Sequence, residues 1–440
     1  MAERARTSLV RAAAGGFAAS VSGSVLSLVN VLVMSRVLGS SGRGHVAFLT
    51  TVAGLTTQVA ALGVPRAAGN FAMQEPENAP RIHGTTIALS VLAGFVAIGA
   101  VSLLIFLVPA AGGGVDPALR WLTLLSIPML LVEAALLQIA RSHYEFGAAN
   151  AGWLVPPIVN ATVNGFLAAT GLLTVGAAVA TWIGGYILIT VLIFTRLLRR
   201  GARFSRPDIP TARRLLHFGI RAHGGQAMLV GNYRMDQWIL GAVASAKELG
   251  VYSVAVAWSE TLFFLPTVVE VTQRPDLVLA DPQQARRSAM TAVRFCLVLT
   301  LIGAVALGLL APVLCTVFFG EDFSDAVPQL RILLLGGFGT AVLKLLGNAL
   351  TSQGYPLRET AAIGVAFVAI VILDATLIPA FGGTGAAWAS LLAYSAGGIA
   401  VLAIFRRTLG GTWRELVPTR EDGQWVRDRL RAVRAARSRG

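Results

Sequence analysis

The stretch that decides the fold is residues 232–258, NYRMDQWILGAVASAKELGVYSVAVAW. It is apolar enough to enter a bilayer, yet Asn232, Arg234 and Asp236 stand close together at its start. A charge near the bilayer centre costs about 2.5–3.5 kcal/mol, so such groups usually face a bundle interior or a wet cavity. Each residue turns a helix by about 100°, so Arg234 and Asp236 point to different sides. The stretch is expected to line a transport cavity, unless its charges only pair with neighbouring helices.

The rest of the chain is similarly apolar. Its 440 residues are 55% hydrophobic and 13% charged, and the mean hydropathy is +0.69. These values exclude an ordinary soluble protein. A helix needs about 20 apolar residues to cross a bilayer core of about 30 Å. Runs of that length predict an all-α integral membrane protein with twelve transmembrane helices, near residues 15–35, 45–64, 84–108, 118–140, 151–171, 176–196, 222–244, 251–272, 290–318, 328–350, 359–380 and 385–405.

The arginines and lysines between these runs predict the orientation. With both termini in the cytoplasm, most of them fall in cytoplasmic segments, as the positive-inside rule requires. The outer side holds only Arg36, Arg43, Arg120, Lys247 and Arg331. We therefore expect a multi-pass protein of the cell membrane, with Arg36 and Arg43 at its outer rim.

The two halves of the chain resemble each other. GAAVAT at 176–181 returns as GAAWAS at 385–390, and Leu119-Arg120 returns as Leu330-Arg331. Similar offsets predict a duplicated six-helix unit, and an even unit keeps both copies in one orientation. The predicted division begins with a basic cytoplasmic N-terminus (1–14) and a first six-helix lobe (15–198). A basic cytoplasmic linker (199–213) leads to a second six-helix lobe (214–406) and an Arg-rich cytoplasmic tail (407–440).

Several charged residues fall inside predicted spans. Arg234 and Lys344 suit a phosphate-bearing ligand, Arg through its fork and Lys as a point charge. The repeat offset pairs Glu133 with Lys344, so these two could face each other across a central cavity. The residues predicted to line that cavity are Arg36, Glu133, Arg234, Glu260 and Lys344.

Two carboxylates form the predicted ion-coupling site. Asp236 and Asp374, brought together in a low dielectric, must hold a proton or a cation between them. Ser390 lies a short turn beyond Asp374 and could add an oxygen ligand. Oxygen ligands of this kind suit a hard cation such as Na⁺. The alternative is that Asp374 only pairs with a neighbouring helix.

Other classes of function are disfavoured. The chain has no GxxxxGK[ST] phosphate loop and no His/Cys cluster with metal spacing, so neither an enzyme nor a cofactor other than Na⁺ or H⁺ is expected. The net charge of +14 flanks membrane spans, so nucleic acid is not an expected partner. The tail fits either a helix on anionic lipid or a disordered basic segment. Cys296 and Cys315 are expected to be buried, unpaired and apolar in character.

Four stretches carry a family resemblance: SRVLGSSGRGHVAF (35–48), LLHFGI with the deciding stretch (215–258), FGEDFSDAVPQLRILL (319–334) and LIPAFGGTGAAWASLLAY (377–394). In their order and spacing the chain resembles the polysaccharide-biosynthesis or O-antigen flippases of the multidrug/oligosaccharidyl-lipid/polysaccharide (MOP) exporter superfamily. The resemblance implies two six-helix lobes around a V-shaped cavity. It also implies flipping of lipid-diphosphate-linked glycans to the outer leaflet.

The lipid II flippase branch is similar at Asp236, Asp374 and Ser390, where it places a sodium site. Here Ile370 stands where that branch has an amide ligand, and the first helix lacks that branch's cavity arginines. A repeat-unit flippase, acting on a polyprenyl-diphosphate-linked oligosaccharide among membrane lipids and polysaccharide assembly proteins, is therefore favoured over a lipid II flippase. A cation-coupled drug exporter and a non-transporting membrane scaffold stay open.

Overall fold

The structure is a computed structural model that describes residues 2–411, apart from the side chains of residues 2–14, 17 and 222. All regular elements within 2–411 are helical, which confirms the predicted all-α class. The first half contains α1 Ala2–Ala60, α2 Val64–Gln74, α3 Ala79–Leu107, α4 Pro117–Leu125, α5 Ile127–Ser142, α6 Phe146–Ala151, α7 Val155–Ala169 and α8 Val175–Arg199. The second contains α9 Ile209–Val243, α10 Ala246–Ser259, α11 Phe264–Leu279, α12 Pro282–Pro312, α13 Ala326–Ser352 and α14 Pro356–Leu409.

Eight helical stretches among the described residues are long and apolar enough to cross a membrane. Two of them, Ala18–Ala60 and Pro356–Leu409, each join two helices across a kink. α7, with 15 residues, and the charged α9 are not among the eight. The twelve predicted ranges all lie largely within helices, but twelve membrane crossings stay a prediction. The predicted tail lies outside the described residues beyond position 411.

Polar caps fix where several helices begin. Asp116 accepts hydrogen bonds from the backbone N–H groups of Ala118 and Leu119 at 2.8 and 3.1 Å, which satisfies two free donors of the first turn. Asp208 caps α9 in the same way through the N–H of Thr211 at 2.8 Å. Ser245 caps α10 through the N–H of Glu248 at 3.2 Å. These caps separate the apolar runs into the observed elements.

Two glycines divide the longest helices. Gly39 has φ +67° and Gly382 has φ +54°, a backbone region that costs other residues energy. A Cβ on Gly382 would also lie 1.9 Å from Oε2 of Glu248. α1 and α14 are therefore each a pair of arms, and Gly39 stands in the turn that was predicted between the first two spans.

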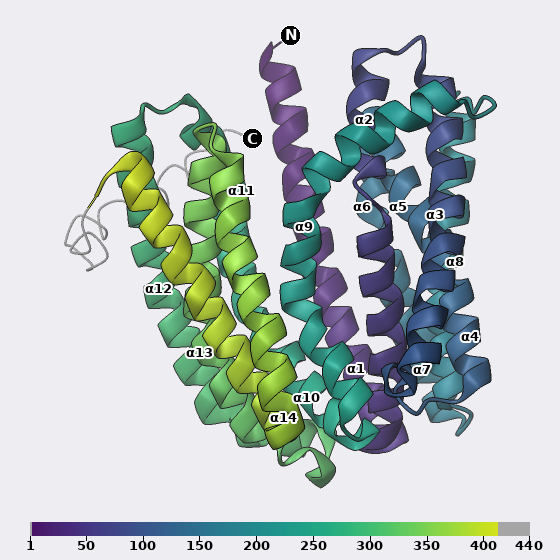
Figure 1. The fold of residues 1–440 in the computed structure, drawn as a ribbon, viewed down its shortest axis with the longest axis vertical. Helices are drawn as coiled ribbons and strands as arrows, with labels where there is room; N and C mark the ends of the chain where they lie inside the picture. The colour runs from purple at the N-terminus through teal and green to yellow at the C-terminus, as the bar shows by residue number, and fades with distance from the viewer. Residues whose placement is uncertain (1, 412–440) are drawn as a thin grey trace.

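Helix α9 joins the two halves. Figure 1 shows its first turns crossing over α2 before the helix descends beside α14. Arg214 forms an ion pair with Glu75 at 2.5 Å and lies over the ring of Phe71 at 4.1 Å. The Arg214 guanidinium holds the pKa of Glu75 below its usual value. Because α1 starts and α14 ends at the same end of the molecule (Figure 1), the described chain is compatible with both termini on one side; which side that is stays a prediction.

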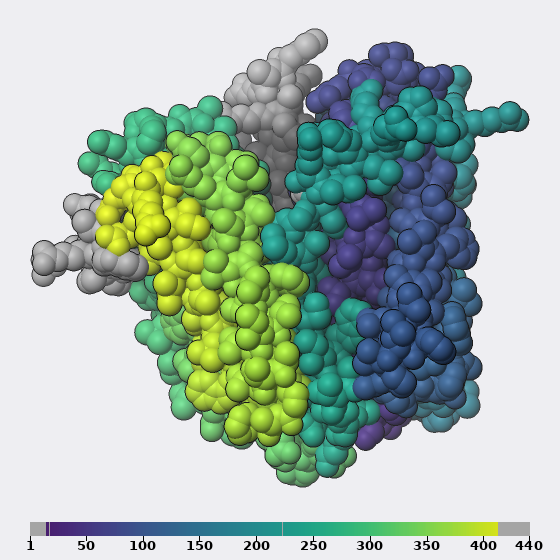
Figure 2. Space-filling model, in the orientation of Figure 1, coloured from purple at the N-terminus to yellow at the C-terminus, as the bar shows by residue number. Residues whose placement is uncertain are grey.

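The halves meet at the opposite end. A Cβ on Gly44 would lie 1.7 Å from the carbonyl oxygen of Ala246, and one on Gly250 would lie 1.8 Å from that of Ser40. α1 and α10 therefore cross with their backbones in contact, within a hydrophobic cluster that includes residues of both halves. Figure 2 shows the halves in contact at this lower end, and a hollow between α3 and α9 above it. That hollow is an apolar groove of about 800 Å³.

Candidate substrate and ion site

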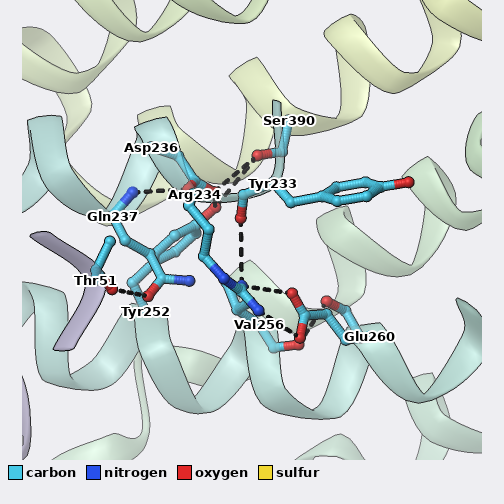
Figure 3. A network of polar contacts seen from close by, with 10 residues as sticks. Thr51, Tyr233, Arg234, Asp236, Gln237, Tyr252, Val256, Glu260 and Ser390 are labelled. Carbon is cyan, nitrogen blue, oxygen red and sulfur yellow. Dashed lines mark hydrogen bonds and ion pairs between the residues drawn. The ribbon is translucent and has the colours of Figure 1, made fainter. Parts of the chain in front are cut away.

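The polar residues at the start of the deciding stretch separate onto two faces of α9, as predicted from their spacing. Arg234 reaches the Glu260 carboxylate, whereas Asp236 points towards α10 and α14 (Figure 3). Asp236 is 2% exposed, while the Arg234 and Glu260 side chains are 37% and 32% exposed. One face is therefore a buried polar cluster, and the other borders open space.

The accessible face carries a bidentate ion pair. Arg234 donates to both Glu260 oxygens, at 2.6 and 3.2 Å. The Arg43 guanidinium, from the first half, lies close enough to repel that of Arg234. Arg43 and Arg234 therefore bring positive charge from both halves into electrostatic reach of each other. Arg43 itself is half-buried and lines a pocket of the first half, and its expected place at the outer rim of the membrane stays a prediction.

Asp236 is held by hydrogen bonds from three elements. Its Oδ1 accepts the backbone N–H of Gln237 at 2.7 Å, and its Oδ2 accepts the Tyr252 hydroxyl at 2.5 Å and the Ser390 hydroxyl at 3.2 Å. Gln237 in turn accepts a hydrogen bond from Thr51 of the first half at 3.1 Å. Figure 3 shows this network lying at the meeting point of α1, α9, α10 and α14.

Asp374 completes the predicted acidic pair. It is fully buried, and neither of its carboxylate oxygens has a hydrogen-bond partner within residues 2–411. It lies near enough to Asp236 for the two charges to repel each other. Asn232, one turn before Asp236, is also fully buried with both amide atoms unpartnered among the described side chains. The structure therefore brings Asp236, Asp374 and Ser390 together and adds Asn232.

Lys344 extends the accessible face. Its Nζ donates to the hydroxyl of Thr267 at 2.8 Å, and the carboxylates of Glu270 and Glu260 are close enough to attract it. Glu270 therefore belongs to the same charged surface. Arg234, Glu260 and Lys344 share this surface, and its role as a substrate cavity stays a prediction.

Glu133 and Arg36 lie apart from it. Glu133 is buried within the first half, where its nearest charge is Arg141, so it does not meet Lys344. The predicted pairing fails because equivalent positions of duplicated halves need not face each other. Arg36 lies at the end where the halves meet, called here the closed end, and donates to the carbonyl oxygens of Val317 and Phe318.

The chain matches known proteins in sequence profile and in fold. The profile of a family described as polysaccharide biosynthesis protein matches residues 33–328, more than half of the chain. The chain belongs to this family. No curated protein matches it at a significant level.

The solved structures that this polysaccharide biosynthesis family member resembles are transporters. The lipid II flippase MurJ, in an inward closed conformation, has a TM-score of 0.71 at 16% identity, covering 88% of this chain and 86% of that one. An inward-facing multidrug resistance MATE transporter of the MOP superfamily has a TM-score of 0.69 at 14% identity, covering 88% of this chain and 94% of that one. A MOP superfamily transporter from Pyrococcus furiosus has a TM-score of 0.58 at 14% identity, covering 90% of this chain and 96% of that one. At these identities the likeness shows the fold, which is that of the MOP superfamily.

Proposed function

We propose that this protein flips a polyprenyl-diphosphate-linked oligosaccharide from the cytoplasmic to the outer leaflet by alternating access. The observation that carries the proposal is the partly exposed Arg234–Glu260 pair, which lies within electrostatic reach of Arg43 of the other half. A partly exposed Arg fork suits a diphosphate, because guanidinium groups bind such oxygens in a bidentate manner. Family membership and the MOP fold support a transported glycan.

The ion pair makes the site switchable. A diphosphate that approaches Arg234 competes with the Glu260 carboxylate for the same fork, and Lys344 lies nearby to add a second positive charge. Once displaced, Glu260 can attract Lys344 instead. The membrane potential favours outward movement of an anionic headgroup by about 2.3 kcal/mol per charge per 100 mV. The charged surface therefore binds the headgroup without holding it permanently.

The buried cluster fits the second part of the proposal, coupling to Na⁺ or H⁺. Two unpartnered Asp374 oxygens and the unpartnered Asn232 carbonyl lie beside Asp236, and hard cations prefer such oxygen ligands. Asp236, Asp374, Ser390 and Asn232 would hold the ion. When bound, it neutralises two carboxylates that otherwise repel. Because Asp236 and Arg234 are two residues apart on α9, a change at one carries to the other through the helix.

Replacement of Arg234 tests the headgroup site. We expect Arg234→Gln to reduce export of the lipid-linked glycan at least tenfold in cells that depend on this protein, since the loss of a charged hydrogen-bonded contact costs about 1.5–3 kcal/mol. Arg196→Gln is the matched control. It breaks the Arg196–Glu145 pair, 2.8 Å long, on the far face of the first half.

Three outcomes are informative. Normal protein levels with lost export in Arg234→Gln, and normal export in Arg196→Gln, support the flippase. Intact export in Arg234→Gln and Lys344→Gln together would contradict it and favour a scaffold. Intact surface glycan with raised sensitivity to lipophilic cations on deletion would instead indicate a drug exporter.

A further inference from the structure

A second polar pocket lies within the first half, apart from the Asp236 cluster. It has a volume of about 200 Å³ and lies between both arms of α1, α7 and α8. It is lined by polar and aromatic side chains, namely Ser27, Asn30, Arg43, Thr50, Asn160, Trp182 and Tyr186, together with apolar neighbours. Its only charged lining residue among those described is Arg43.

Two of these side chains have unused hydrogen-bonding atoms. Asn160 is 8% exposed, and its Oδ1 has no partner in the described part of the chain. The buried Nε of Arg43 also has none. Asn30, by contrast, is fixed by a hydrogen bond from Asn164 at 2.8 Å. Because buried polar atoms are seldom left without a partner, the pocket is built to receive a polar ligand.

The aromatic wall narrows the ligand class. Trp182 and Tyr186 stand one turn apart on α8, with ring centroids 5.1 Å apart and planes at 67°. Such rings offer apolar surface to C–H groups, while amides and a guanidinium opposite them offer hydrogen bonds. A sugar ring has both kinds of surface. The single unneutralised cation further indicates that the ligand carries negative charge.

The position of the pocket relates it to the headgroup site. Thr50 lines the pocket, and its neighbour Thr51 donates a hydrogen bond to Gln237 of α9, one turn after Arg234. A group in the pocket would therefore be next to a diphosphate bound at Arg234. In a lipid-linked glycan, the sugar next to the diphosphate is the first one attached.

We propose that this pocket binds one anionic sugar of the transported glycan, the sugar nearest the diphosphate. Arg43 pairs with its carboxylate, and Asn160 accepts a hydrogen bond from a ring hydroxyl. The Trp182 and Tyr186 rings cover its apolar face. This proposal rests on the proposed flippase function and specifies part of the substrate.

Thermal unfolding of the purified protein in detergent tests it, with glucuronate, glucose and inorganic phosphate as probes. Glucuronate is expected to raise the midpoint temperature of unfolding in a saturable manner. Glucose should need at least tenfold higher concentrations for the same rise, and phosphate should raise the midpoint only weakly. Asn160→Asp should weaken glucuronate binding at least tenfold, because the new carboxylate pairs with Arg43. Arg43→Gln should do the same. Arg196→Gln, outside the pocket, should bind glucuronate like the parent protein.

Asn160→Asp nearly preserves side-chain volume, so it answers the question even if Arg43→Gln does not fold. A phosphate effect equal to that of glucuronate would show a bare anion site and overturn the sugar assignment. So would the absence of any glucuronate effect, or unchanged binding in Asn160→Asp. Glucuronate binding with intact export in Arg234→Gln and Lys344→Gln together would remove the flippase and leave the sugar site. The reverse pattern would remove the sugar site alone.

Discussion

Asp374 is a fully buried carboxylate with no hydrogen-bond partner among the described residues. A buried carboxylate without hydrogen bonds is costly unless it is neutralised, and its neighbour Asp236 carries the same charge. We expect NaCl to raise the thermal midpoint of the parent protein relative to choline chloride, since an ion that binds only the folded state stabilises it. Asp374→Asn should abolish this effect while the protein still folds, because the change is isosteric. Asp276→Asn, on α11, is the control.

Transport assays complete this prediction. Export that depends on Na⁺ in the parent protein and is lost in Asp374→Asn would identify the cation. An indifference to Na⁺ together with a dependence on the pH gradient would assign the site to a proton. Unchanged export and unchanged Na⁺ response in Asp374→Asn would remove the coupling role from this cluster.

For individual residues, positions that follow from helix geometry could be predicted from the sequence, whereas positions that depend on packing between distant helices could not. Arg234 and Asp236 were separable because helical geometry alone sends them to different faces. Asn160 and Asn164 stand one turn apart, and that spacing was a usable sign of a polar stripe on α7. The pocket that Arg43 lines is built from residues of α1, α7 and α8 that are far apart in the chain. Local sequence does not contain that information.

Among the elements, α1 and α10 cross with their backbones in contact and hold the two halves together at the closed end. Since a Cβ on Gly250 would lie 1.8 Å from the Ser40 carbonyl oxygen, Gly250→Ala must push the helices apart. We expect a several-fold loss of export and faster maleimide labelling of a cysteine placed at Ala47, which is 2% exposed beside the crossing. Gly54→Ala on α1 is the matched control, because nothing lies within 4 Å of its added Cβ. Equal labelling in both variants would show that the crossing is not a gate.

The helix pattern was predictable from hydropathy, whereas two features of the elements were not. The fifth predicted span covers 151–171, but α7 has only 15 residues and begins one residue before Pro156–Pro157. The first turns of α9 bind the first half through Arg214 and Glu75, although the sequence repeat starts a second unit there. A repeat reports ancestry and register, but packing decides which half each turn contacts.

At the scale of the whole molecule, the direction of transport depends on which side of the membrane the open end faces, that is, the end opposite the crossing of α1 and α10. The closed end carries Arg36 on the carbonyls of Val317 and Phe318, and the positive-inside rule places this end outside. The gap between the halves would then accept substrate from the cytoplasm. Since the native cysteines 296 and 315 are both buried, single added cysteines can report the orientation without removing them.

We expect Leu172→Cys, between α7 and α8 and 63% exposed, to react with a membrane-impermeant maleimide in intact cells. Arg203→Cys, in the exposed segment between α8 and α9, should react only after the membrane is opened. The opposite pattern would invert the orientation and with it the outward direction of flipping. Because α8 alone separates the two positions, reaction of both from outside would mean that α8 does not cross the membrane, and the six-helix unit itself would then be wrong.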